Sequence, residues 1–395
     1  MRRASKKILV FNYYPLKVPP TTGGEARLYN IYYHMAAQNP DLYITFLGPY
    51  YGHKQDERTL KIAPNFEAHY VAKAELYHYY LPKIVEELER GADPHGINSI
   101  LCSKLNSNIG KKYLEIYEDQ DIIIHEHPYE NYSDVMAEMG DKPRIYSSHN
   151  VESKMFDAFS NNICFRSIIN ECEIDLARKA DKVFAVSTAD KEYFLRYNEE
   201  VEIMPNGFDE KQSREILNSK IKSPYAGRRI SLFVGSSHKP NVDAADYIIS
   251  TLAPMMLDTD FVICGSCCSY ITAPPGENVY VKGFVSDKVK SELMHASSVF
   301  VNPIESGGGS NLKIIEAMSS GTRVVSTHFG ARGYDISEKG ILYTCDLKDM
   351  IETIKLALAD RAYPDNFKNW SEEIYEKYSW RNISKKFTEE VRDLL

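Results

Sequence analysis

Short runs of apolar and β-branched residues alternate with longer amphipathic segments along most of the chain. The short runs predict buried strands, and the longer segments predict helices with one apolar face. In the first half, the expected strands are 7–12, 42–47, 121–125, 144–147 and 182–187, and the expected helices lie around 25–38, 74–90 and 165–179. This alternation is typical of parallel α/β units.

The pattern changes over residues 203–228, where a predicted turn is followed by a polar stretch that closes with Ser223-Pro-Tyr-Ala-Gly227. We interpret this stretch as a domain linker. The alternation then resumes, with expected strands at 229–235, 261–264, 279–282, 299–303 and 322–326 and expected helices at 241–256, 287–296 and 311–320. We therefore predict an α/β fold of two Rossmann-like, doubly wound domains, 1–208 and 209–378, with ligands at the carboxyl ends of the strands.

Composition narrows the class of protein. A chain of 395 residues with 43% hydrophobic and 26% charged residues accommodates two soluble domains. No apolar run approaches the roughly 18 residues needed to span a bilayer, and we expect no signal peptide, so the predicted location is the cytoplasm. The net charge of −8 argues against nonspecific nucleic-acid binding. The seven cysteines are expected to be reduced structural thiols.

The segment from Glu305 to Glu316 carries the most specific pattern. After a predicted buried strand, the three glycines Gly307, Gly308 and Gly309 lead into a helix. The helix is expected to start at Ser310, Asn311 and Leu312. Glycines allow a ligand to approach the backbone closely, and a helix start offers free amides and a positive dipole, which together favour phosphate binding. Lys313 would add a cation, and the Glu316 carboxylate would accept hydrogen bonds from a ribose diol. The alternative is a flexible loop before a core helix with a Lys313–Glu316 surface pair.

Two further segments follow strands of the first domain. Gly23 and Gly24 open a predicted helix after the first strand, which again suggests an anion-binding turn. Arg27 is interpreted either as a ligand group or as a helix-surface charge. His149 and Asn150 follow the strand at 144–147, where their side chains offer donors and acceptors to hydroxyl groups, although a lone histidine is usually structural.

In the second domain, Gly235, Ser236, Lys239 and Asn241 follow the first strand. The glycine would again bring the backbone close to a ligand, and Lys239 would place a point charge on a phosphate. The alternative for Lys239 is an ordinary loop lysine.

Several acidic and histidine clusters resemble metal sites. Asp119 with Asp121, and Asp258 with Asp260, precede their strands and are read as turn residues. His125-Glu-His127 lacks an evident third zinc ligand. We predict no metal and no bound cofactor.

The order of these motifs resembles the family 4 glycosyltransferases, retaining enzymes with two Rossmann-like domains facing a cleft (the GT-B architecture). The resemblance rests on the glycine-rich first loop, His149-Asn-Val-Glu152, Ala185-Val-Ser-Thr188, Ile203-Met-Pro-Asn-Gly-Phe-Asp209, Phe233-Val-Gly-Ser236, Gly283-Phe-Val285 and Glu316-Ala-Met-Ser-Ser-Gly-Thr-Arg-Val-Val-Ser326. It also includes the closing segment, 379–395, which would pack back on the first domain.

This resemblance implies a nucleotide-sugar donor in the second domain and an acceptor in the first. Glu316 would bind the ribose, and the backbone near Gly283 and Phe284 would bind the base. Lys239, Lys313 and the amides of residues 310–312 would hold the diphosphate, while His149 would lie near the donor sugar. Transfer would proceed with retention, without a metal and without an essential protein base.

One departure concerns the sugar-contacting carboxylate. The family often carries a glutamate where this chain has Gly308, as in a triple-glycine variant of the motif. One interpretation is that Glu305 substitutes for that glutamate from a different loop shape. Two alternatives to a transferase are a sugar-nucleotide epimerase and a non-catalytic binding subunit. The abundance of tyrosine, 28 residues, suggests a glycan or lipid-linked acceptor and peripheral association with the inner face of a membrane. The sugar, the base and the oligomeric state stay open.

Overall fold

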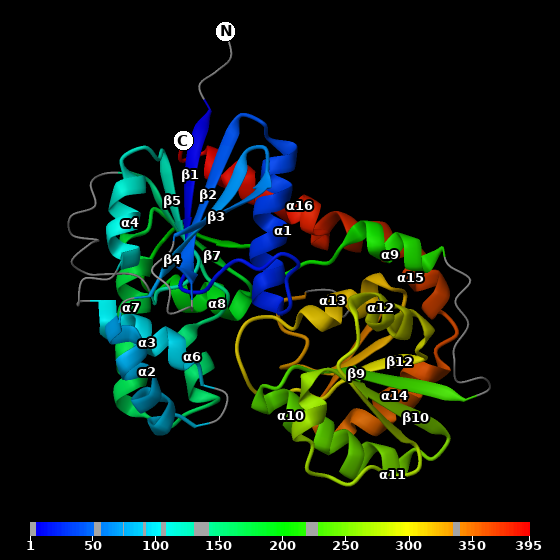
Figure 1. Cartoon of the computed structure of the whole chain (residues 1–395). Coiled ribbons are helices and arrows are strands. Elements are labelled where there is room, and N and C mark those ends of the chain that lie inside the picture. The colour runs from blue at the N-terminus through cyan, green and yellow to red at the C-terminus, as the bar shows by residue number, and fades with distance from the viewer. Residues whose placement is uncertain are drawn as a thin grey trace. The chain divides into compact units, whose positions relative to one another are not determined.

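The computed structural model describes residues 5–50, 57–73, 75–89, 92–103, 108–129, 142–218, 228–334 and 340–395. The chain divides into two compact units (Figure 1). Unit 1 comprises Met1–Met204 and Arg381–Leu395, and unit 2 comprises Pro205–Trp380. The segment Ser223–Gly227, at the end of the predicted linker, lies outside the described residues.

Unit 1 is built on an eight-stranded sheet of order β3-β4-β2-β1-β5-β6-β7-β8. Its strands are β1 (Lys6–Phe11), β2 (Leu42–Tyr50), β3 (Arg58–Ala63), β4 (Phe66–Ala72), β5 (Ile122–His125), β6 (Arg144–Ser147), β7 (Lys182–Ala185) and β8 (Val201–Ile203). All neighbouring pairs are parallel except β3 with β4, which form an antiparallel edge. The central strands are buried on both faces, as expected for a parallel sheet covered by helices.

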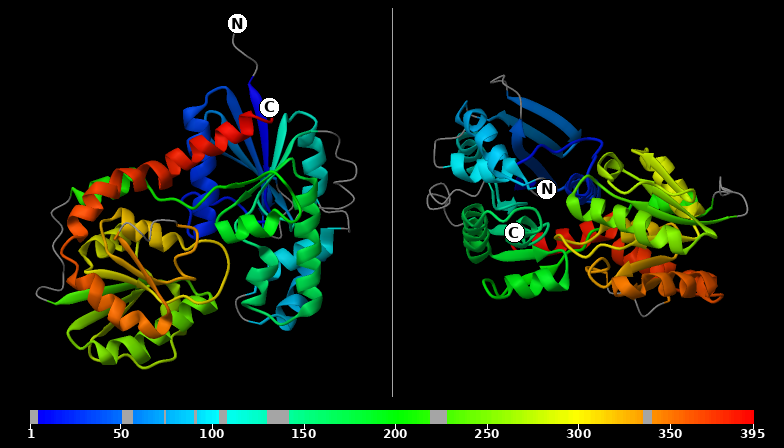
Figure 2. Two further views of the ribbon diagram at one scale, coloured as in Figure 1. Left: turned by 180° about the vertical axis from the view of Figure 1, so that it is seen from behind. Right: turned by 90° about the horizontal axis from the view of Figure 1, so that it is seen from below.

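Helices flank this sheet and fix its loops. They are α1 (Gly23–Gln38), α2 (Glu75–Glu87), α3 (Pro94–Ser103), α4 (Asn108–Tyr117), α6 (Glu152–Asp157), α7 (Ile163–Lys179), α8 (Thr188–Phe194) and α16 (Trp380–Arg392). A capping box between Thr22 and Glu25 sets the start of α1 immediately after the first loop. The last helix packs on this unit, because Ser384 Oγ donates to the Ile31 carbonyl and the Phe387 ring contacts Tyr32 and Phe184 (Figure 2).

Unit 2 contains a six-stranded, wholly parallel sheet of order β11-β10-β9-β12-β13-β14. Its strands are β9 (Arg229–Val234), β10 (Thr259–Cys264), β11 (Val279–Gly283), β12 (Val299–Asn302), β13 (Val324–Thr327) and β14 (Leu342–Cys345). Its helices are α9 (Glu210–Leu217), α10 (Lys239–Tyr247), η1 (Ile248–Leu252), α11 (Ala253–Met255), η2 (Ser266–Tyr270), α12 (Asp287–Ala296), α13 (Leu312–Ser319), η4 (Leu347–Asp349), α14 (Met350–Ala359) and α15 (Tyr363–Tyr378). Two apolar cores pack against this sheet.

The predicted α/β fold with two parallel-sheet domains is confirmed, while several local expectations change. The polar stretch interpreted as a linker contains α9, which Asp209 caps by accepting a hydrogen bond from the Gln212 amide. Its Ser213 and Ile216 are buried in unit 2, so a short amphipathic helix was mistaken for a connecting segment. The expected helix at 241–256 is interrupted by the π-turn η1.

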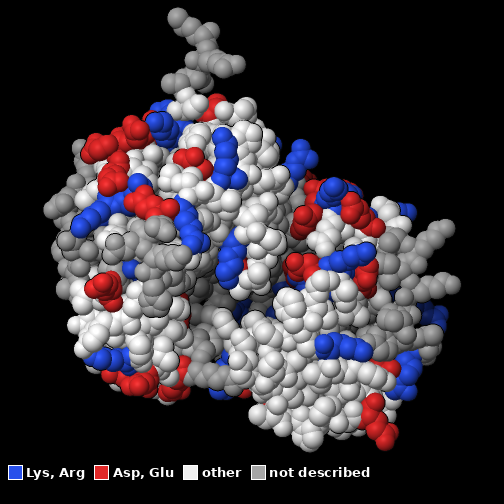
Figure 3. All heavy atoms as spheres, viewed as in Figure 1, with Lys and Arg blue, Asp and Glu red and all other residues white. Residues whose placement is uncertain are grey.

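Surface character adds two observations. Among the described residues, no helix combines the length and apolar composition needed to cross a bilayer. On the face shown in Figure 3, basic and acidic side chains of the described residues are interspersed, so neither sign forms a continuous stripe there.

Candidate functional site

In unit 2 the candidate site lies where the strand order reverses. From β9 the chain continues to β10 and β11 on one side, and it then returns to β12 on the other side of β9. The loops after β9 and β12 therefore leave neighbouring strands at the same sheet edge, which is the usual ligand-binding position of such sheets. These loops carry Gly235 and the glycine triplet.

The glycine triplet has a backbone that favours glycine. Gly307 and Gly309 have φ angles of 113° and 59°, in the left-handed region that side chains disfavour. A Cβ on Gly307 would lie 3.7 Å from Pro240 Cγ, so this loop reaches the start of α10. Arg332 Nη2 donates to the Gly308 carbonyl at 2.6 Å and holds the loop from the segment after β13.

The start of α13 presents backbone amides. Asn311 occupies the N-cap position without making a side-chain cap, because its Nδ2 instead donates to the Gly330 carbonyl at 2.7 Å. Ser310 Oγ accepts a hydrogen bond from Asn206 Nδ2 at 3.0 Å. The first amides of the helix, from Leu312 onward, are thus not capped by the Asn311 side chain, and an anion is a suitable partner for them.

Lys313 lies in the first turn of α13 and points into the unit. Its Nζ donates to Asn241 Oδ1 and lies 4.6 Å from the centre of the Phe233 ring. Burial lowers the pKa of Lys313 to about 7 from its ordinary value of 10.5. Lys313 bonds Asn241 and not Glu316, so the interpretation of these two residues as a surface pair is wrong.

Glu316 forms an ion pair that the sequence analysis missed. Its two carboxylate oxygens lie 3.0 and 3.2 Å from Lys290 Nζ on α12. Lys290 also contacts Asp287 at 3.3 Å, and these carboxylates raise the pKa of Lys290 although burial opposes them. Lys290 therefore stays charged and fixes the carboxylate of Glu316. No local pattern around Lys290 distinguishes it from Lys288, the other lysine of α12.

The loop after β9 is in direct contact with the Lys313 cluster. A Cβ on Gly235 would lie 2.9 Å from both Asn241 Cβ and Cys267 Sγ, so a larger residue does not fit without movement. Asn241 Nδ2 donates to Ser236 Oγ at 3.0 Å. Asn241 thus joins the two loops, because its other side-chain atom accepts from Lys313.

Four further predicted residues lie apart from this hydrogen-bonded cluster. Lys239 is the first residue of α10, is exposed, and pairs with Asp243 at 2.6 Å. Glu305 is exposed and forms no hydrogen bond or ion pair with the described residues. Phe284 is 81% exposed and follows Gly283, whose φ is 70° and whose surroundings are open.

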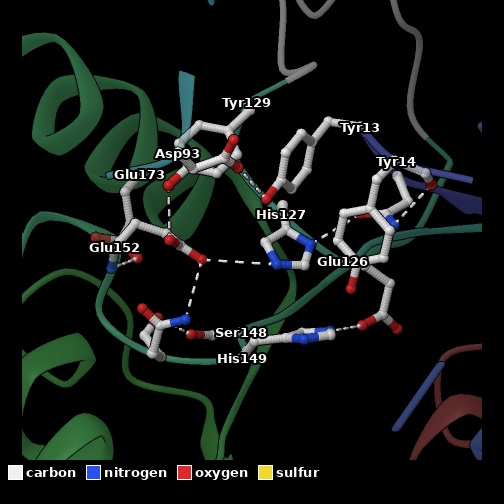
Figure 4. A network of polar contacts seen from close by, with 12 residues as sticks. Tyr13, Tyr14, Asp93, Glu126, His127, Tyr129, Ser148, His149, Glu152 and Glu173 are labelled. Atoms are coloured by element: carbon white, nitrogen blue, oxygen red, sulfur yellow. Dashed lines mark hydrogen bonds and ion pairs between the residues drawn. The ribbon is translucent and has the colours of Figure 1, made fainter. Parts of the chain in front are cut away.

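In unit 1, a second polar cluster lies at the carboxyl ends of β1, β5 and β6 (Figure 4). The three strands deliver Tyr13 and Tyr14, Glu126 and His127, and Ser148 and His149. These strands are neighbours, and the order of the sheet reverses between β1 and β5. The cluster therefore occupies the switch point of the first sheet.

His149 is bonded to a carboxyl group within this cluster. Its Nε2 lies 2.7 Å from Glu126 Oε2, and the Tyr32 hydroxyl donates to the other oxygen of Glu126. Burial raises the pKa of Glu126, whereas burial and then the charge of Arg27 lower the pKa of His149 well below its usual range. Burial thus favours the neutral forms of both groups.

His127 and Glu152 extend the cluster. His127 Nδ1 lies 2.8 Å from Asn12 Oδ1, and its ring centre lies 4.2 Å from that of His149. Burial lowers the pKa of His127 well below its usual range. Glu152 accepts from the Tyr129 hydroxyl at 2.7 Å and from Asn150 at 3.3 Å. Burial, reinforced by a neighbouring carboxylate, raises the pKa of Glu152 well above its usual range.

The cluster continues away from the strand ends. The Tyr13 hydroxyl donates to Asp93 at 2.5 Å, and Glu173 accepts from the Tyr146 hydroxyl and from the Glu152 amide. The sequence analysis missed these groups and weighed Glu126 and His127 only as part of an isolated zinc motif. The adjacency of β1, β5 and β6 was the available signal, since parallel strands place their carboxyl ends together.

The three residues predicted at the first loop, Gly23, Gly24 and Arg27, all lie in the first turns of α1. A Cβ on Gly24 would lie 3.0 Å from the Tyr14 hydroxyl and 3.5 Å from His149 Nδ1, so this glycine lets α1 begin against His149. Gly23 precedes it as the first residue of α1. Arg27 is 1% exposed and donates to the Met204 carbonyl at 2.9 Å, which makes its interpretation as a surface charge wrong.

The acidic motifs that imitate metal sites are engaged in other contacts. Asp121 binds the Lys6 ammonium at 3.0 Å and accepts from the Lys7 amide at 2.8 Å. Asp258 pairs with Arg229, and Asp260 pairs with Arg228. Among the described residues, no group of three or more His, Cys, Asp or Glu side chains is arranged to hold a metal ion.

Among the comparisons with known proteins, the match to a family model lies in unit 2. Residues 228–360 match the family model described as Glycosyl transferases group 1. No curated protein matches the chain.

Solved structures resemble the whole chain at low sequence identity. The E. coli trehalose-6-phosphate structure bound with UDP-2-fluoro glucose has a TM-score of 0.70 at 11% identity and covers 98% of both chains. The sucrose-phosphate synthase from Thermosynechococcus elongatus has a TM-score of 0.69 at 15% identity, over 98% of this chain and 99% of that one. The trehalose-phosphate synthase (UDP-forming) from Burkholderia vietnamiensis gives 0.68 at 11% identity, over 98% and 100%. These likenesses establish the fold, and the two parallel-sheet units match the GT-B glycosyltransferase architecture.

Proposed function

We propose that this protein transfers a sugar from a nucleotide-diphosphate sugar to a hydroxyl acceptor, with the donor bound by unit 2. The observation that carries the proposal is the cluster of Lys313, Asn241 and Gly235 beside the start of α13. It combines a buried ammonium, uncapped amides and a close backbone approach, which suits a diphosphate. The match of residues 228–360 to a glycosyltransferase model covers this same part of the chain.

The neighbouring residues complete a nucleotide site in this proposal. Glu316, held by Lys290, accepts hydrogen bonds from the ribose hydroxyls. The open backbone at Gly283 and Phe284 contacts the base. On donor binding, Lys239 leaves its ion pair with Asp243 and binds a phosphate oxygen. The glycine triplet and residues 310–312 surround the diphosphate.

Chemistry at this site depends mainly on stabilising the departing nucleoside diphosphate. Negative charge develops on the leaving phosphate as the sugar bond breaks, and Lys313 with the α13 amides meets that charge. We propose that transfer retains the anomeric configuration, that a donor phosphate oxygen takes the acceptor's proton, and that no metal is needed. We further propose that the glycine triplet is a variant of the family 4 motif, in which Glu305 replaces the glutamate that the family often carries at the position of Gly308.

Unit 1 supplies the acceptor site in this proposal. Imidazole, phenol and carboxyl groups gather around His149 and Tyr13 (Figure 4), and the Asn150 amide donates to Glu152 in the same cluster. Such groups offer both donors and acceptors to sugar hydroxyls. A glycan or lipid-linked glycan is the acceptor we propose, and peripheral association with the inner face of a membrane stays a prediction.

The test is a donor screen with UDP-, GDP-, ADP- and CDP-sugars, read by thermal shift and by donor hydrolysis. Lys313→Ala and Glu316→Ala are expected to abolish turnover, whereas Lys355→Ala, an exposed lysine of the same unit paired with Glu352, is the matched control. Near-normal turnover in either site variant contradicts the donor assignment.

The same screen separates the alternatives. An isomerised sugar nucleotide formed from donor alone identifies an epimerase, and tight nucleotide binding without turnover identifies a binding subunit. Turnover unchanged by EDTA is expected, and strong inhibition overturns metal independence.

A further inference from the structure

Three thiols gather beside the proposed donor site, at the carboxyl end of β10. They belong to Cys264, Cys267 and Cys268, and all three cysteines are free. Cys267 Sγ contacts the Cys264 carbonyl at 3.6 Å, and Cys268 Sγ contacts the Ile263 carbonyl at 3.4 Å. The thiols of Cys267 and Cys268 also interact directly with each other.

Backbone contacts connect this cluster to both loops of the donor site. A Cβ on Gly235 would lie 2.9 Å from Cys267 Sγ, so this sulfur lies directly under the loop after β9. Gly265 immediately precedes η2, and its amide donates to the Gly283 carbonyl at 2.8 Å. The Cys268 thiol itself hydrogen-bonds the backbone of Gly283 and contacts Cys267, so a change in the volume of the Cys268 side chain is transmitted to the loops proposed to hold the diphosphate and the base.

The three thiols differ in access and in acidity. Cys264 and Cys267 are buried, whereas Cys268 is half-buried. Burial raises the pKa of Cys264 to about 12, and the contact with Cys268 followed by burial raises the pKa of Cys267. The same contact lowers the pKa of Cys268 to about 7. Only Cys268 of the three is thus both accessible and substantially ionised near neutral pH.

We propose that Cys268 is a covalent modification site, which forms a mixed disulfide with a low-molecular-weight disulfide and thereby prevents donor binding. The Cys268 thiolate attacks one sulfur of the small disulfide, a new S–S bond forms, and the other half departs as a thiolate. Cys268 is oxidised, and the departing half is reduced. An added thiol reverses the step by the same exchange, so the modification is a reversible control of the donor site.

The consequence for the donor site rests on the proposed function. An adduct on Cys268 adds a bulky group to η2 and disrupts the contacts of the thiol with Cys267, which lies under Gly235, and with the backbone of Gly283, so that these loops move. A bound donor nucleotide, conversely, holds the loops in place and shields the thiol. Modification and nucleotide binding are therefore expected to exclude each other.

The experiment treats the whole protein with glutathione disulfide and maps the adducts by mass spectrometry of peptides. Nucleotide affinity is measured before treatment, after treatment, and after reduction with dithiothreitol. We expect an adduct at Cys268, a loss of affinity of at least tenfold, and full recovery on reduction. Cys268→Ser should keep its affinity through the treatment. Cys164→Ser, which removes the exposed thiol of α7 in unit 1, should respond like the unmodified sequence.

Two outcomes overturn the proposal: an adduct confined to other cysteines, or an adduct at Cys268 that leaves affinity unchanged. Protection of Cys268 by nucleotide in the unsubstituted protein is a second measurement, which does not depend on the folding of any variant, and its absence also counts against the proposal. Absence of nucleotide binding before any treatment instead contradicts the proposed function. The two failures are thus distinguishable.

Discussion

Replacing Lys313 by methionine is expected to stabilise the protein while it removes donor binding. Methionine keeps most of the side-chain volume and the contact with the Phe233 ring, but it carries no charge into the interior. Lys313 Nζ has one hydrogen-bond partner among the described side chains, Asn241, and lies over the Phe233 ring. The free protein therefore carries a buried ammonium whose desolvation only a bound diphosphate would offset.

The magnitude follows from the displaced pKa of Lys313. A fall from the ordinary 10.5 to about 7 corresponds to about 5 kcal/mol of unfolding free energy at about 1.36 kcal/mol per pH unit. This is an upper bound, because part of the side chain is exposed and methionine leaves Asn241 without its donor. We expect a gain of about 1–2 kcal/mol for Lys313→Met at pH 6.5.

The sign of the pH dependence is also fixed. The unfolded chain keeps its proton on Lys313 up to about pH 10.5, whereas the folded chain releases it above about pH 7. Since the unfolded state binds more protons in this interval, the stability of the unsubstituted protein rises with pH there. The advantage of Lys313→Met should therefore be largest below pH 7 and should shrink toward pH 9.5.

Urea unfolding at pH 6.5, 8 and 9.5, followed by circular dichroism, measures this difference. Lys355→Met is the control, because Lys355 is exposed and its removal should leave the stability and its pH dependence unchanged. A variant that is less stable than the unsubstituted protein at pH 6.5 would refute the reasoning. So would a stability difference that is independent of pH.

Three further predictions concern other contacts of the two sites. Lys290→Met should raise the donor KM about tenfold, equivalent to about 1.4 kcal/mol, with little change in kcat, because Glu316 loses its partner. Lys288→Met, on the same helix, should change neither constant, and equal effects in the two variants contradict the role of Lys290. Gly235→Ala should weaken nucleotide affinity about tenfold in a calorimetric titration, whereas Gly276→Ala, whose Cβ meets nothing closer than 3.7 Å, should not weaken it. Unchanged affinity in Gly235→Ala argues against a close approach of the ligand to the backbone at Gly235. Glu126→Ala should lower the free energy of unfolding by about 1–3 kcal/mol, because Tyr32 and His149 lose their hydrogen bonds to the carboxyl group. Glu126→Gln should retain most of the stability, and equal losses for the two variants in a thermal denaturation assay contradict the hydrogen-bond argument.

The sequence predicted those parts of the fold and site that depend on local pattern. The glycine triplet and Lys313 stand next to each other in the chain, and their relation to the helix start follows from spacing alone. The Lys290–Glu316 pair joins two helices, whereas the sequence analysis considered only the nearby Lys313 as a partner of Glu316, and only as the alternative to a ribose ligand. The buried bond between Glu126 and His149 was equally out of reach, because it depends on which strands are adjacent. Helix α9 was missed because its few apolar positions lie in a polar stretch.

The route of the chain through unit 1 has a consequence for biosynthesis. Unit 1 is assembled from two separate stretches of the chain, Met1–Met204 and Arg381–Leu395, while Pro205–Trp380 between them forms a separate compact body. Until the last helix leaves the ribosome, Tyr32 and Phe184 lack the Phe387 ring that covers them in the finished fold. The nascent first unit therefore keeps this apolar surface exposed while the second unit is translated. A chain in this state is prone to associate with other chains. Replacement of Phe387, which is far from either site in the sequence, by a small residue is expected to act by prolonging that state.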